Sequence, residues 1–210
     1  MKLTRDDIEA LPKRERAAFI NSISGFKPAN LVGTADSEGH YNLAIMSSAV
    51  HVGAHPPLLA LIIRPGGDER HTLTNILDTR YYTINHVGID FIAQAHQTAA
   101  RYPQGESEFD HCGLHAHVEA GFHAPFVAEA RLRMGMRLAE HHELKINGTH
   151  LVIGEVLSVE LPDAALRTDY TVDLVAAGTS VLAGLESYGE VTALKRMAYA
   201  KPDLPPREID

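Results

Sequence analysis

The sequence predicts a mainly β fold, an antiparallel barrel with helical additions. Its apolar segments are mostly short, rich in β-branched residues and bounded by turn-forming residues, which is typical of strands. Few stretches between them are long enough for a complete β–α–β crossover, and this favours an antiparallel barrel over a doubly wound parallel sheet. At 210 residues the chain corresponds to about 1.4 typical domains, so we expect residues 1–210 to form a single domain.

Several segments carry the strand pattern. Residues 58–63 are apolar on both faces and are therefore expected to form a central strand that is buried on each side. Asn147 and Gly148 predict a hairpin turn, and the apolar spacing of residues 72–77 predicts a short helix. The predicted strands span residues 31–35, 43–52, 58–63, 81–87, 131–138 and 150–161.

The two ends of the chain are expected to lie beside the barrel as arms. Residues 1–25 predict a helical arm, because Thr4 can cap a first short helix and Pro12 suits the first turn of a second. A last helix is expected over residues 191–199. The prolines that follow predict an extended tail over residues 200–210.

Composition and charge exclude several classes of protein. The 27 acidic and 19 basic residues give a net charge of −8, which argues against a general binder of nucleic acid or anionic membranes but permits a local basic pocket. Cys112 is the single cysteine, so no intrachain disulfide is expected and a reducing compartment fits. The first residues lack the apolar stretch of a signal peptide, and the longest apolar run is far shorter than the ~20 residues of a membrane-spanning helix. We therefore expect a cytoplasmic protein without a membrane partner.

Motifs of the common nucleotide and hydrolase sites are missing from the sequence. The chain contains no Gly-x-Gly-x-x-Gly, no P-loop and no Gly-x-Ser-x-Gly. A Rossmann cofactor site, a P-loop nucleotide site and a serine-hydrolase elbow are therefore not expected, and no catalytic residue can be named from a motif.

The chain has 13 histidines, and several of them gather around the cysteine. His111, Cys112, His115, His117 and His123 are close in sequence, and His115 and His117 would share one face of a strand, which suits a metal ion. Their spacing matches no recognised zinc pattern. A solvated, histidine-rich loop is therefore favoured, and no metal site is predicted.

The turn after residues 58–63 gathers groups that suit a phosphate. Arg64, Arg70, His71, Thr72 and Asn75 surround this turn, and the N–H groups at a helix start bind anions well together with an arginine. The residues alone leave a second interpretation open, in which both arginines are solvated surface charges and Thr72 is an ordinary helix cap.

Motifs along almost the whole chain are each loose but specific in their order and spacing. They are Asn30-Leu-Val-Gly-Thr-Ala-Asp-Ser-Glu-Gly39, Asn42-Leu-Ala-Ile-Met-Ser-Ser48, Pro56-Pro57-Leu58, Arg70-His-Thr-Leu-Thr-Asn-Ile76, Ser107-Glu-Phe-Asp110 with Gly113-Leu114, Leu151-Val-Ile-Gly-Glu-Val156 and Tyr199-Ala-Lys-Pro-Asp-Leu-Pro-Pro206. With these motifs, residues 23–206 resemble the flavin reductase-like, FMN-binding split-barrel family (the flavoredoxin group). Where that family often has Lys-Asp-Thr, this chain has Arg70-His71-Thr72, which keeps the positive charge and replaces aspartate by histidine.

The resemblance implies a six-stranded antiparallel split β-barrel that forms a homodimer, with FMN near the subunit interface. Residues 44–50 would run along the flavin ring. The cofactor-binding residues that the resemblance implies are Met46, Ser47, Ser48, Ala49 and Val50 along the ring and ribityl chain, Arg64, Arg70, His71, Thr72 and Asn75 toward the phosphate, and Asn85 at the end of its strand.

The implied activity is NAD(P)H-dependent reduction of flavin, or of a small acceptor, by hydride transfer through N5 of FMN. The cofactor supplies the redox chemistry, so the protein needs to bind and orient it rather than supply a general acid. Arg101, Tyr102 and Phe109 are candidates for binding substrate at the open flavin face, and an interface loop against a second subunit fits them equally. Two alternatives remain: a non-enzymatic flavin carrier for electron transfer or flavin delivery, and a histidine-rich metal-binding barrel.

Overall fold

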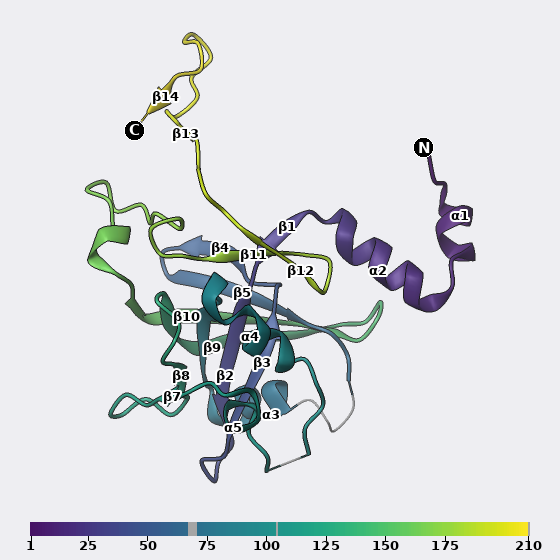
Figure 1. The fold of residues 1–210 in the computed structure, drawn as a ribbon, viewed down its shortest axis with the longest axis vertical. Coiled ribbons are helices and arrows are strands. Elements are labelled where there is room, and N and C mark those ends of the chain that lie inside the picture. The colour runs from purple at the N-terminus through teal and green to yellow at the C-terminus, as the bar shows by residue number, and fades with distance from the viewer. Residues whose placement is uncertain (67–70, 104, 210) are drawn as a thin grey trace.

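A seven-stranded antiparallel sheet forms the centre of the molecule in the computed structural model (Figure 1). The structure describes residues 1–66, 71–103 and 105–209. The strand order is β3-β2-β6-β9-β10-β5-β4, and each neighbouring pair is antiparallel. The strands of this sheet are β2 (Asn30–Ala35), β3 (Tyr41–Met46), β4 (Val50–Ala54), β5 (Pro57–Ile63), β6 (Tyr81–His86), β9 (Arg133–Leu144) and β10 (Thr149–Glu160).

The mainly β prediction is confirmed, whereas the expected six strands are corrected to seven. The predicted segment 43–52 divides into β3, which ends at Met46, and β4, which begins at Val50, and these two strands form the opposite edges of the sheet. The predicted central strand is β5, which instead lies beside the edge strand β4. The Ile62 side chain of β5 is 41% exposed, so one face of this strand is not covered within the described chain.

Alternating side chains of the sheet fill a hydrophobic core on each face. On β2, Leu31 packs into one core and Val32 into the other, as the two-residue period of a strand requires. Helix α3 adds Ile76 to the core around Val32, whereas α4 and α5 add Ala95 and Phe109 to the core around Leu31. Helix α3 therefore lies on the opposite face of the sheet from α4 and α5. The helices are α1 (Arg5–Ala10), α2 (Lys13–Ile23), α3 (His71–Thr79), α4 (Ile92–Gln97) and α5 (Glu108–Cys112), with 3₁₀ turns η1 (Ile89–Phe91) and η2 (Asp163–Ala165).

The N-terminal arm extends away from the sheet (Figure 1). Thr4 caps α1, because its side chain accepts the N–H of Asp7 while the Asp7 carboxylate accepts the N–H of Thr4 at 2.7 Å. Neither α1 nor α2 has a buried residue. The chain then joins a small sheet of β1 (Phe26–Pro28), β11 (Ser180–Ala183) and β12 (Ser187–Glu190).

The C-terminal arm differs from the prediction. Residues 191–199 contain no helix; they include β13 (Arg196–Met197), which pairs with β14 (Glu208–Ile209). The tail expected to be extended over residues 200–210 therefore turns back on itself within its described part. The pairing of β13 with β14 outweighs the weak helical spacing of this segment, as tertiary contacts commonly do.

Two further short strands, β7 (Ala116–His117) and β8 (Phe126–Val127), pair within the region predicted as a long loop. Of the helices in the described ranges, none is long and apolar enough to span a bilayer.

Gly154 lies where β10 passes the buried ring of Tyr82. A Cβ at Gly154 would overlap the Tyr82 hydroxyl and lie 2.8 Å from the ring carbon that carries it. We expect Gly154→Ala to lower the free energy of unfolding by about 1–3 kcal/mol in urea denaturation, since the fully buried ring has no room to move. Gly53→Ala is the control, because the nearest atom to a Cβ there is 3.5 Å away. Equal losses in the two variants would contradict the steric explanation.

His86 at the end of β6 is buried, and its Nδ1 lies 3.1 Å from Thr179 Oγ1. Burial lowers the pKa of His86 from 6.5 to about 4. The unfolded chain therefore binds a proton at this residue between about pH 6.5 and 4 while the folded chain does not, so stability falls as the pH falls through this window.

We expect His86→Gln to remove about 2–3 kcal/mol of the stability difference between pH 7 and pH 4, as measured by urea denaturation at each pH. The exposed His51 gives the control His51→Gln. A pH dependence in His86→Gln that equals that of the wild type would show that His86 is protonated in the folded protein.

Candidate functional site

Strand β3 and helix α3 meet at a buried cluster of polar side chains. Asn42 Nδ2 on β3 donates to Thr72 Oγ1 at 2.9 Å and to Thr34 Oγ1 at 3.2 Å. Asn75 Nδ2 on α3 donates to the same Thr34 oxygen at 3.2 Å. All four residues are buried, so these hydrogen bonds fix the start of α3 against β2 and β3.

This network sets which atoms of the cluster remain able to donate. The Thr72 oxygen accepts the Asn42 amide, so its hydroxyl proton is directed elsewhere. Sequence reasoning named Thr72 and Asn75 but included Asn42 and Thr34 only as members of motifs. Thr34 follows the core residue Val32 on the same face of β2, and a polar side chain at such an inward position is the signal that would have identified the cluster.

The outer edge of β3 is closed by side chains from a later segment. Leu43 N–H donates to the Glu108 carboxylate at 2.7 Å, and Ile45 N–H donates to Thr98 Oγ1 at 3.0 Å. Burial raises the pKa of Glu108, while the Leu43 N–H and the nearby His71 and His111 act in the opposite direction. Glu108 therefore lies between the edge of β3 and the first residue of α3.

The segment predicted to follow the flavin ring has a mixed environment. Met46 and Ala49 pack against the core around Val32. Ser48 Oγ donates to the Ile62 carbonyl at 2.8 Å and accepts the Ile62 N–H at 3.2 Å, so this side chain attaches the segment to β5. Ser47 is half-buried and Val50 is 49% exposed, which leaves these two side chains on the accessible side.

The predicted phosphate-binding residues are brought together in part. His71, Thr72 and Asn75 lie on the first turns of α3, and Arg64 is exposed just after the end of β5. Arg70 lies outside the described residues.

Asn85 is separate from this group. Its Nδ2 donates to the Leu31 carbonyl at 3.0 Å and to Thr83 Oγ1 at 2.8 Å, and its Oδ1 accepts the Val127 N–H at 3.0 Å. Because Asn85 pairs with Leu31 in the sheet register, its side chain lies on the opposite face from Thr34. The structure therefore gives Asn85 a place in the core of the β6–β8 region rather than beside α3.

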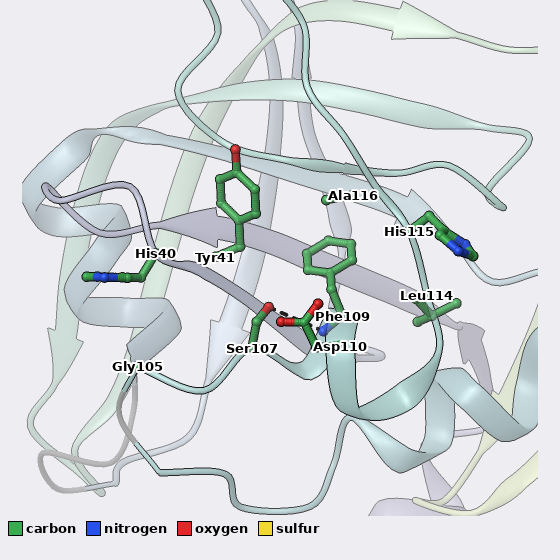
Figure 2. A pocket seen from close by; sticks show the side chains of 9 residues that line it. All are labelled: His40, Tyr41, Gly105, Ser107, Phe109, Asp110, Leu114, His115 and Ala116. Carbon is green, nitrogen blue, oxygen red and sulfur yellow. Dashed lines mark hydrogen bonds between the residues drawn. The ribbon is translucent and has the colours of Figure 1, made fainter.

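A pocket of about 420 Å³ opens between β3 and the 105–116 segment (Figure 2). The rings of Tyr41 and Phe109 meet edge to face inside it, with centroids 6.4 Å apart. Its lining combines apolar side chains with imidazole, hydroxyl and carboxylate groups, a composition that suits a small organic ligand. The lining residues are His40, Tyr41, Gly105, Ser107, Phe109, Asp110, Leu114, His115 and Ala116.

Of the three predicted substrate-binding residues, Phe109 lines this pocket and the other two do not. The Tyr102 ring stacks on His111 at a centroid distance of 4.7 Å, and its hydroxyl accepts Gln97 Nε2–H at 3.2 Å. Arg101 is exposed just before Tyr102.

The predicted histidine cluster is dispersed among different partners. His111 pairs with Glu106 at 2.8 Å, His115 with Glu129 at 2.7 Å, and His123 Nε2 lies 2.9 Å from the Asp36 carbonyl. Within the described ranges, no three histidine, cysteine or carboxylate side chains gather in a way that could hold a metal ion.

Comparison with known proteins agrees with the motifs quoted above. Residues 24–178 match the model of the flavin reductase like domain. A proposed flavin reductase with a split barrel domain from Shewanella frigidimarina is 50% identical, and the match covers 95% of this chain and 100% of that one with a TM-score of 0.92.

Two more distant structures share the fold. Flavoredoxin of Desulfovibrio vulgaris is 22% identical over 83% of this chain and 92% of its own, with a TM-score of 0.71. An FMN-binding protein from Thermus thermophilus is 17% identical over 80% of this chain and 88% of its own, with a TM-score of 0.66. The family match covers well over half of the sequence, and the resemblance inferred from the motifs is confirmed: this chain belongs to the flavin reductase like domain family.

Proposed function

We propose that this protein binds FMN and catalyses NAD(P)H-dependent reduction of flavin, or of a small acceptor, as a homodimer. The buried network at the start of α3 is the observation that carries the proposal. It holds the Thr72 hydroxyl beside β3, the strand that leads directly into the predicted flavin segment. One short stretch of backbone thus connects a phosphate-binding turn to a ring-binding segment.

The chemistry of the available groups fits FMN. Toward the phosphate, Thr72 offers a hydroxyl proton, Arg64 offers a guanidinium group, and the resemblance adds Arg70. Toward the ring, Ser47 offers a hydroxyl and Val50 an exposed apolar surface. The set contains hydrogen-bond donors, a positive charge and apolar surface, which are the groups that a phosphorylated planar cofactor requires.

Bound FMN would supply the redox chemistry, and the residues of this chain would bind and orient it. The α3 network holds the phosphate end, while Ser48 holds residues 47–49 against β5. The pocket with Tyr41 and Phe109 is the proposed place for an aromatic or nicotinamide substrate, whose orientation by rigid side chains supplies much of the rate enhancement in such reactions.

Exposed apolar side chains beside Val50 support a second copy of the chain as the partner. Val50 pairs with Ala60 on β5, so Val50 and Ile62 project from the same face of the sheet. These two side chains are 49% and 41% exposed. A face of this kind next to the flavin segment suits a subunit contact.

The activity is tested by anaerobic mixing of the FMN-loaded protein with NADH and then NADPH. We expect the visible flavin absorbance to bleach with at least one of them, because hydride transfer reduces the ring. Retained colour with both nucleotides would instead identify a flavin carrier. A protein that is colourless as isolated and takes up no FMN when it is supplied in excess would overturn the proposal.

We expect Arg70→Ala to weaken FMN binding by about 1.5–3 kcal/mol, because a hydrogen bond to a charged phosphate is lost. Fluorescence titration measures the dissociation constant. Riboflavin lacks the phosphate, so its affinity should be nearly the same for both proteins. Arg14→Ala is the matched control, since it removes the same charge from α2 in the N-terminal arm. An equal loss of riboflavin and FMN affinity would rule out the phosphate assignment.

A further inference from the structure

The motif Ser107-Glu-Phe-Asp110 has no role in the proposed binding of FMN, yet the structure uses its members in one unit. Ser107 caps α5 and accepts the Phe109 N–H at 3.3 Å. Glu108 turns inward to β3, and Phe109 turns into the pocket beside Tyr41. Gly113 ends the helix in a left-handed conformation with φ of 68°. Helix α5 is thus a short rigid piece with one polar contact to the sheet and one apolar contact to the pocket.

The contact of Glu108 falls at a sensitive point of the sheet. Strand β3 is an edge strand, so the N–H groups of Leu43 and Ile45 have no strand partner on their outer side. Glu108 and Thr98 supply the acceptors, and we call this pair the β3 clamp. Thr98 Oγ1 also donates to the Ala95 carbonyl at 2.8 Å, which ties the clamp to the end of α4.

A carboxylate at this place is costly, because Glu108 is 7% exposed and burial disfavours its charge. An apolar residue would avoid that cost but would leave the Leu43 N–H without an acceptor. The side chain also lies near His71, the first residue of α3. Glu108 therefore touches or approaches three parts at once: the strand before the flavin segment, the start of the phosphate-end helix and the pocket wall.

We propose that Glu108 is a positioning residue, whose carboxylate holds the Phe109 side of the pocket in register with the strand that leads to the flavin segment. This inference rests on the proposed function. Leu43 lies two residues from Tyr41 on one wall of the pocket, and Glu108 is adjacent to Phe109 on the other wall. The single hydrogen bond between them sets the separation of the two rings, and hence the space in which a substrate meets the cofactor.

Two variants separate the reach of the side chain from its charge. Glu108→Gln keeps the length and an oxygen acceptor but removes the charge. Glu108→Asp keeps the charge but is one methylene shorter, so it no longer reaches the Leu43 N–H. Both are small changes, and urea denaturation checks that each variant is folded.

Amide hydrogen exchange measured by NMR reports the clamp directly. In Glu108→Asp we expect the Leu43 amide to exchange roughly tenfold faster, while the Ile45 amide, which Thr98 holds, serves as the internal reference. In the FMN-loaded protein the KM for NAD(P)H should rise roughly threefold to tenfold, with a smaller change in kcat. Glu108→Gln should restore both the protection of Leu43 and the KM.

Several outcomes overturn the inference. Faster exchange at Leu43 with an unchanged KM would make Glu108 a purely structural residue. A raised KM in Glu108→Gln together with a normal value in Glu108→Asp would show that charge, not reach, is the property that matters. A wild-type protein that binds no FMN would instead overturn the proposed function, and that result is read separately from the exchange at Leu43.

Discussion

Hydrogen bonding at the open edge of β3 is the constraint on which most of the candidate site depends. A sheet that ends at this strand leaves outward N–H groups that must find acceptors. Glu108 and Thr98 provide them from a segment more than fifty residues further along the chain, as the sequence separations of 65 and 53 residues show. The same segment carries Phe109 into the pocket, so closing the edge and building the pocket are one structural event.

A second constraint acts on the other face of the sheet. There, Asn42 joins β3 to α3 through Thr72, and Asn75 and Thr34 complete the network. Buried amides and hydroxyls of this kind are favourable only when they are satisfied together, which makes the relative position of β3 and α3 specific. Strand β3 is therefore fixed from both sides, by a carboxylate and a hydroxyl at its edge and by an amide network beneath it.

Local patterns in the sequence were sufficient for most of the architecture. Apolar alternation placed β2, β6, β9 and β10, and helical spacing of Leu73, Ile76 and Leu77 placed α3. The division of segment 43–52 was not visible, because it depends on Ser48 replacing a backbone partner of the distant Ile62. The absence of a helix in residues 191–199 depends in the same way on pairing with residues 208–209.

The candidate site was predictable to the extent that it is local. His71, Thr72 and Asn75 fall on one helix and were found by their spacing, whereas Glu108 acts through Leu43, which is remote in sequence. Asn85 resembled a ligand-binding residue because it ends a strand, but three hydrogen bonds to distant groups occupy its amide. Sequence reasoning fails where the partner of a polar side chain is set by tertiary folding.

The short connection between β3 and β4 has a geometric consequence for the whole sheet. These strands are its two edges, and only residues 47–49 separate them in the chain. Seven strands laid flat at ~4.8 Å spacing would put the outer two about 29 Å apart. Four fully stretched residue steps, from Met46 to Val50, reach no more than about 14 Å. The sheet must consequently curl until its margins nearly meet, and the Ser47–Ser48 link crosses the remaining gap like a stitch across a seam.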